Sequence, residues 1–174
     1  FSARDSVSTP RRGRSGRARI AHALSPGACL RTSGDSLQHG QMKLYRPVGI
    51  QELRLIAASN WAAFPPRLEG QPIFYPVLNE RYATQIARDW NPTDAASGFA
   101  GFVTAFTLNA KFVTRYEVQV VGDGSHQELW VPAEELREFN RNIEGRIEVL
   151  SSFYGERFDE QIDATSQLPV SVRS

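Results

Sequence analysis

The stretch QPIFYPVLNERYATQIARDW, residues 71–90, combines two hydrophobic patterns and decides the class of fold. Residues 71–77 are aromatic and bounded by prolines, which is typical of a short strand. Asn79 then begins a helical pattern, because asparagine is a preferred helix N-cap. We expect one face of this helix to carry Tyr82, Ala83, Ile86 and Trp90. A strand that leads directly into an amphipathic helix indicates a domain that mixes α and β structure.

Similar patterns on both sides of this stretch complete the prediction. Strands are expected near residues 42–46, 71–77, 100–108, 116–121, 126–131 and 146–153, and helices near residues 49–61, 79–90 and 132–143. Pro132 suits the first turn of the third helix, and Gly145 introduces the last strand. Because helices come early and consecutive strands come late, we predict an α+β fold with a mixed or antiparallel sheet and flanking helices.

Residues 1–41 differ in composition from the rest of the chain. They carry seven Arg and two Asp, are rich in Ser and Gly, and lack a periodic apolar face, so we expect this tail to be disordered. Five Arg within residues 11–19 would attract nucleic acid, and an Arg- and Ser-rich start also fits a targeting presequence. We favour a linker or a non-native segment, since Met42, the first methionine, directly precedes the first strand. The domain is therefore placed at residues 42–155, with residues 156–174 as a C-terminal tail.

Several classes of protein are excluded by what residues 42–174 lack. They contain no G-x-G-x-x-G, Walker-type or G-x-S-x-G motif, and their one histidine leaves no serine or cysteine triad. The single cysteine of the chain, Cys29, excludes an internal disulfide and a multi-cysteine zinc site. No apolar run is long enough to span a bilayer. We therefore expect a cytoplasmic protein without a metal ion or a membrane partner.

The stretch VVGDGSHQELWVP, residues 120–132, places charged side chains in a strand-forming run. Alternation sends Leu129 and Val131 into the core and leaves His126, Glu128 and Trp130 on the other side of the strand. The glycines around Asp123 predict a hairpin turn before this strand. The outward side is therefore either solvated or part of a site.

Three regions of the chain resemble the signature regions of the ADP-ribosyltransferase fold, in that family's order. They are LYR at residues 44–46, IFYPVLNERYATQIA at residues 73–87, and the lone Glu128 after a glycine-rich loop. The runs LYRPVG, FPPR and HQELWVPAEEL are also similar to small bacterial proteins labelled "ADP-ribosylation/crystallin J1". The crystallin J1 half of that label refers to a helical, metal-dependent hydrolase family whose paired-aspartate motifs are missing here, so we discard it.

The resemblance implies that NAD is the substrate and that Glu128 is catalytic, with Arg46 and Tyr75 shaping the pocket. Cleavage of the nicotinamide–ribose bond passes through an oxocarbenium-like state, which a suitably placed carboxylate stabilises selectively. Arg46 offers a planar fork for a pyrophosphate, and Tyr45 or Tyr75 a flat face for a ring. His126 offers a proton or a contact to the ribose. The expected activity is transfer of ADP-ribose to an unknown acceptor, or hydrolysis of NAD.

The chain departs from the family pattern at two positions. An arginine in the first region belongs with a Ser-Thr-Ser run in the second, but IFYP supplies Tyr75 instead. The family's Glu or Gln two residues before the catalytic Glu is replaced by His126, and Gln127 is adjacent. A catalytically inactive ligand-sensing or protein-interaction module of the same fold is therefore the alternative. Each of the three residues also has an ordinary structural alternative: Arg46 in a surface ion pair, Tyr75 as a packing residue and Glu128 as a solvated side chain.

A second group of residues lies in loops at the ends of the predicted elements, where binding sites are often built. Its members are Phe64, Arg67, Tyr75, Asp89, Trp90 and Asn91. They would form a shallow aromatic groove, or the prolines among them would simply stiffen a long connection. We favour the second interpretation.

Overall fold

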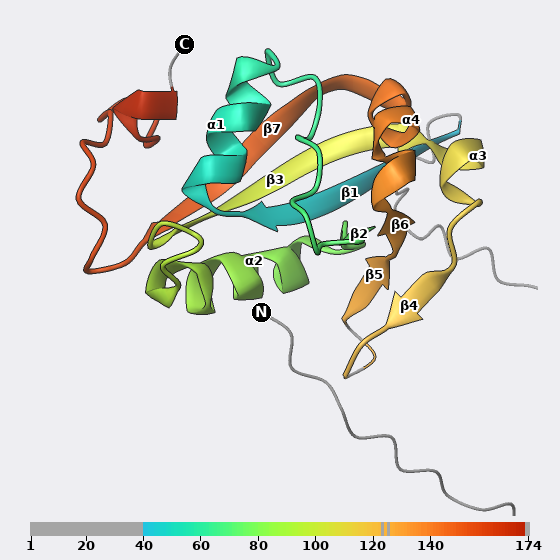
Figure 1. Ribbon diagram of the computed structural model, residues 1–174, viewed down its shortest axis with the longest axis horizontal. Coiled ribbons are helices and arrows are strands. Elements are labelled where there is room, and N and C mark those ends of the chain that lie inside the picture. Colours follow the sequence, from blue (N-terminus) through green and yellow to red (C-terminus); the bar gives the residue numbers. More distant parts are fainter. Residues whose placement is uncertain (1–39, 123, 125, 173–174) are drawn as a thin grey trace, which may run out of the picture. The chain divides into compact units, whose positions relative to one another are not determined.

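A three-stranded antiparallel sheet lies at the centre of the computed structural model, which describes residues 40–122, 124 and 126–172. Its strands are β1 (Gln41–Val48), β3 (Ala100–Asn109) and β7 (Ile143–Tyr154), with β3 in the middle (Figure 1). The predicted α+β class with antiparallel pairing is confirmed. The predictions for residues 1–39 and for Asp123 fall outside the described residues.

Four short strands extend this sheet beyond β1. They are β2 (Ile73–Phe74), β4 (Val118–Val120), β5 (Gln127–Leu129) and β6 (Val131–Pro132). β2 pairs with β6, and the isolated bridge between Val77 and Glu128 continues that pairing in the same register. A second bridge joins Val77 to Tyr45 of β1. Residues 73–77 therefore lie between β1 and β5, and β4 pairs with β5 on the outside.

The helices cover both faces of the sheet. α1 (Ile50–Ala58) and α2 (Glu80–Asp89) lie on opposite faces of the three long strands (Figure 1). The remaining helical segments are α3 (Ala110–Val113), α4 (Leu136–Arg141) and the 3₁₀ turns η1 (Asn91–Thr93), η2 (Ala133–Glu135) and η3 (Val170–Val172).

Each face of the sheet has its own hydrophobic cluster. The larger cluster lies on the α1 side and contains a group of contacting aromatic rings, Phe64, Phe74, Phe106 and Phe139. The smaller cluster lies under α2 and consists of Val77, Tyr82, Ala83, Ala87 and Val103. Because neighbouring residues of a strand point to opposite faces, the cluster that a residue joins also shows which face it occupies.

Helix α2 begins as predicted and buries most of the predicted face, with Tyr82 and Ala83 buried and Ile86 packed against them. The side chain of Asn79 accepts a hydrogen bond from the backbone N–H of Tyr82 at 2.8 Å, as expected of an N-cap. Ala87 is fully buried, whereas Trp90 is 60% exposed, so the prediction for Trp90 was wrong. The helix ends at Asp89, and its last turn approaches β3 so closely that a Cβ at Gly101 would lie 1.9 Å from the carbonyl oxygen of Ala87. Only glycine fits there without a shift of the backbone.

The largest differences from the predicted elements lie in the second half of the chain. The helix predicted at residues 132–143 is split into η2 and α4, and β7 already begins at Ile143. Gly145 lies inside β7 with a φ of 81°, near a register shift against β3, so it forms a bulge rather than a strand boundary. The short helix α3 was not predicted. It follows β3 directly, and its N-cap Asn109 accepts hydrogen bonds from the backbone of Lys111 and Phe112.

Residues 156–172, which the sequence interpretation places after the domain, fold back onto α1. Val172 is 4% exposed and joins the larger hydrophobic cluster. Arg54 of α1 forms an ion pair with Glu160 and donates a hydrogen bond to Ser171 at 2.9 Å. Among the described residues, no helix has the length and apolar character needed to cross a membrane.

Candidate functional site

The carboxylate of Glu128 is held by two hydrogen-bond donors on the α2 face of the sheet. The hydroxyl of Tyr82 in α2 donates to Oε1 at 2.7 Å, and the indole N–H of Trp130 donates to Oε2 at 3.2 Å. The predicted alternation is confirmed, because Leu129 and Val131 are fully buried while Glu128 and Trp130 are not. The two bonds engage both oxygens and fix the orientation of the carboxylate.

Aromatic rings surround this carboxylate, and with it they form what we call the Glu128 cluster. His126 stacks on Tyr82, with ring centroids 4.2 Å apart and an angle of 15° between the planes. The register of residues 73–77 places Tyr75 opposite Trp130, and their rings meet edge to face at 6.1 Å. Tyr75 and Trp130 are 39% and 48% exposed, so two of the rings are open to a ligand.

Tyr45 and a lysine lie on the same face, one strand further along. The bridges join Tyr45 to Val77 and Val77 to Glu128, so these three side chains form a row across neighbouring strands. The ammonium of Lys43 lies 5.8 Å from the centre of the Tyr45 ring. Lys43 therefore adds a positive charge to this face, and the sequence interpretation gave this residue no role.

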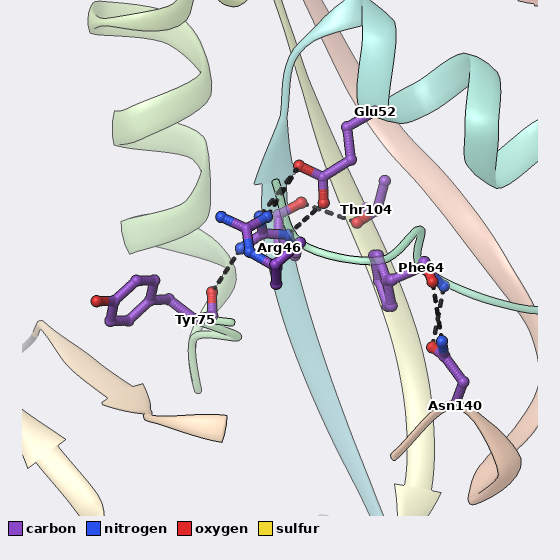
Figure 2. Close-up of polar contacts among 7 residues, drawn as sticks. Arg46, Glu52, Phe64, Tyr75, Thr104 and Asn140 are labelled. Atoms are coloured by element: carbon purple, nitrogen blue, oxygen red, sulfur yellow. Dashed lines mark hydrogen bonds and ion pairs between the residues drawn. The ribbon is translucent and has the colours of Figure 1, made fainter. Parts of the chain in front are cut away.

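Arg46 lies on the opposite face of the sheet, next to α1. Its Nε and Nη2 donate to the two oxygens of Glu52 at 2.7 and 3.0 Å, and its Nη1 donates to the backbone carbonyl of Tyr75 at 3.1 Å (Figure 2). The guanidinium lies over the Phe74 ring, 4.5 Å from its centre, and only 7% of the residue is exposed. The Thr104 hydroxyl also donates to the backbone carbonyl of Arg46. All three nitrogens of Arg46 are engaged within the protein, and the structure does not bring its guanidinium together with Glu128.

A second guanidinium, that of Arg67, shares the same glutamate. Its Nη1 lies 3.9 Å from Oε2 of Glu52, too far for a hydrogen bond. Its Nε is buried and has no hydrogen-bond partner among the described residues. Burial and the neighbouring charge of Arg46 lower the pKa of Arg67, although Glu52 and Tyr75 act in the opposite direction.

The second predicted group of residues is divided by the fold. Arg67 and Tyr75 lie near Glu52, and Phe64 packs against Phe74 in the core beside them. The other three, Asp89, Trp90 and Asn91, lie at the C-terminal end of α2 and in η1, where Asp89 pairs with Arg88.

A hollow of about 320 Å³ borders the Glu128 cluster on the β4 side. Trp130 belongs to both, and Gln119, the residue paired with Glu128 across β4 and β5, also lines the hollow. Tyr116 and Glu135 also line the hollow, and the hydroxyl of Tyr116 donates to Glu135 at 2.9 Å. The pKa of Tyr116 is raised, mainly because the side chain is partly buried and also because of this hydrogen bond. A volume of this order lies at the lower end of small-molecule sites, which span about 300–1,000 Å³.

Sequence patterns did not assign a role to several residues of these sites. Tyr82 was expected to pack in the core and Trp130 to face outward, but neither was linked to Glu128. The link requires the first turn of α2 to lie beside Glu128, a contact between residues 46 positions apart that no local pattern reports. Glu52 was missed for a similar reason, because only the start of α1 beside β1 brings it to Arg46.

The comparisons with known proteins found no match: no family model, no curated protein and no solved structure corresponds to the chain. Within the described part of the chain, no group of three or more His, Cys, Asp or Glu side chains is arranged to hold a metal ion. Any function is therefore argued from the geometry of the site itself.

Proposed function

We propose that the Glu128 cluster binds NAD and transfers its ADP-ribose to an acceptor or to water, as the resemblance to ADP-ribosyltransferases suggests. The observation that carries the proposal is the carboxylate of Glu128, oriented by Tyr82 and Trp130 among aromatic rings. A fixed carboxylate can stabilise positive charge that develops on a ribose without reorganising during the reaction. The exposed rings of Tyr75 and Trp130 supply flat surfaces for nicotinamide or adenine.

In this proposal, the bond between ribose C1′ and the nicotinamide nitrogen breaks, and its electron pair leaves with nicotinamide. Glu128 accepts a hydrogen bond from a ribose hydroxyl and faces the positive charge that develops at C1′. The acceptor oxygen or nitrogen, or a water, then forms the new bond to C1′ and releases a proton. His126, which stacks on Tyr82 beside Glu128, offers a ring nitrogen that accepts this proton.

The role of Arg46 in this proposal changes from a phosphate ligand to a positioning residue. Its bond to the carbonyl of Tyr75 holds residues 73–77 against β1, and its two bonds to Glu52 leave no free nitrogen. Lys43, beside Tyr45 on the Glu128 face, is the cation we assign to a pyrophosphate.

The test replaces Glu128 by glutamine and measures NAD affinity by calorimetry and nicotinamide release separately. Because the carboxylate acts mainly in the transition state, Glu128→Gln should leave NAD affinity within a few-fold and lower turnover by about a hundredfold or more. Glu148→Gln, at an exposed position of β7, is the matched control and should change neither quantity. Absence of NAD binding by the unmodified protein rejects the proposal, and equal turnover in Glu128→Gln removes Glu128 from the mechanism.

The alternative, a non-catalytic ligand-sensing or protein-interaction module, also has a specific observation in its favour. Both oxygens of Glu128 and every nitrogen of Arg46 already have partners within the protein, as expected of structural residues. NAD binding without release of nicotinamide would favour this alternative.

A further inference from the structure

We propose that Arg67 forms a second binding site, for a phosphate or pyrophosphate group, on the α1 face of the sheet. The geometry points to this site because Arg67 is a largely buried guanidinium without a hydrogen-bonded counter-ion. Only 13% of its side chain is exposed, its Nε has no partner among the described residues, and its nearest carboxylate oxygen is 3.9 Å away. The site does not depend on Glu128 or on NAD chemistry.

The charges around Arg67 do not balance. Arg46 occupies both oxygens of Glu52 at 2.7 and 3.0 Å, so Arg67 has only a longer contact with a carboxylate that is already shared. Two guanidinium groups with one carboxylate leave a net positive charge in a partly desolvated place. An unpaired charge or donor in such a place is costly, and a bound anion removes that cost. The lowered pKa of Arg67, caused first by burial and then by Arg46, agrees with a missing anion.

The chain around Arg67 is held in place rather than loose. Pro65 and Pro66 fix the backbone before it. Phe64 exchanges two hydrogen bonds with the side chain of Asn140, at 3.0 and 2.8 Å (Figure 2). Its ring packs against Phe74 and Phe106. The guanidinium is therefore presented by an anchored loop, which lowers the entropy lost when a ligand binds.

The ligand class follows from the geometry of the guanidinium group. Its planar fork matches the paired oxygens of a phosphate, and such bonds are stronger than those between neutral groups. An oxyanion at the exposed edge of Arg67 neutralises the excess charge of the Arg46–Glu52–Arg67 group.

Titration calorimetry of the full chain with inorganic pyrophosphate, at constant ionic strength in sodium chloride, tests this site. Arg67→Gln should weaken binding by about tenfold or more, because it removes the fork and its charge. Arg88→Gln removes an exposed arginine whose partner is its neighbour Asp89, and should leave the affinity within about twofold. Lys43→Gln, which removes the cation assigned to the pyrophosphate of NAD, should bind inorganic pyrophosphate like the unmodified protein, which separates this site from the proposed NAD site.

Thermal melting without ligand gives a second readout. Since Arg67 loses no short hydrogen bond on substitution, Arg67→Gln should melt at or above the temperature of the unmodified protein. Absence of pyrophosphate binding by the unmodified protein at about 1 mM, or equal binding by Arg67→Gln, overturns the proposal. A melting temperature of Arg67→Gln lower by more than about 5 °C also overturns it, because Arg67 would then be a structural residue. Arg67→Lys, which keeps the charge without the fork, should bind with intermediate affinity.

Discussion

At the scale of single residues, the two arginines near Glu52 show how differently the same side chain can be used. Arg46 has a partner for each nitrogen and an aromatic ring beneath it, which makes it part of the scaffold. Arg67 lies 3.9 Å from the same glutamate, and its Nε has no hydrogen-bond partner in the part of the chain that the structure describes. Residue type alone suggested a ligand role for Arg46, but its contacts make it a positioning residue, and on this face we propose a ligand for Arg67 instead.

Tyr82 offers a residue-scale test of the Glu128 cluster. Tyr82→Phe removes the hydroxyl that donates to Glu128 and keeps the ring that stacks on His126. We expect a loss of about 1–2 kcal/mol in the free energy of unfolding, because a charged acceptor loses one of its donors. If the proposed activity is present, turnover should also fall, since the carboxylate is less well oriented.

Urea denaturation and nicotinamide release measure the two effects. Tyr154→Phe is the control, because its hydroxyl donates to the carbonyl of Gln167 away from Glu128. It should lower stability without changing turnover. A Tyr82→Phe protein with unchanged stability would show that the hydroxyl does not hold Glu128 in solution.

At the scale of elements, α2 is the helix on which the Glu128 cluster depends, because it carries Tyr82. Its position is set by the predicted Tyr82, Ala83 and Ile86, together with a close approach of Ala87 to Gly101 that the sequence pattern did not show. The N-cap at Asn79 fixes where the helix begins, and therefore which turn faces Glu128.

Gly101→Ala tests this close approach. The added methyl group would lie 1.9 Å from the carbonyl oxygen of Ala87, so the helix or the strand must move. We expect a loss of about 1–3 kcal/mol or more in the free energy of unfolding, measured by urea denaturation. Gly124→Ala, where the added group meets nothing within 4 Å, should cost far less. Equal stability of the two variants would mean that α2 does not pack on β3 as described.

Sequence patterns predicted an element well where its bounds depend on neighbouring residues. They predicted poorly where its shape or exposure depends on a contact with a distant part of the chain. The strand-to-helix order and the cap at Asn79 follow from residues within a few positions of each other. The bulge at Gly145 depends on pairing with β3, and the exposure of Trp90 depends on where α2 meets that strand. Glu128 was identified from its own position in a strand, but Tyr82, its partner, required the folded arrangement.

At the scale of the whole molecule, residues 156–172 complete the larger hydrophobic cluster. Val172→Ala should lower the free energy of unfolding by about 1.5–2.5 kcal/mol, because it removes two buried methyl groups from the cluster next to α1. Val170 lies in the same 3₁₀ turn but is 46% exposed, so Val170→Ala should cost less than about 0.5 kcal/mol. Thermal or urea unfolding checks both. If the two variants are equally stable, the segment does not unfold together with the rest of the domain.

Residues 73–77 are the one strand segment that both proposed sites share. The carbonyl of Tyr75 is bound by Arg46 on the α1 face, while its ring meets Trp130 beside Glu128 on the other face. An anion on Arg67 competes with its contact to Glu52, and Glu52 in turn holds Arg46, which binds the carbonyl of Tyr75. The anion would therefore act on the same backbone that positions the rings around Glu128. Two ligands that act on one segment are thermodynamically linked, so each should change the affinity of the other by the same factor. Binding on one face of the sheet would then change the affinity of the site on the other face, without any direct contact between the two ligands.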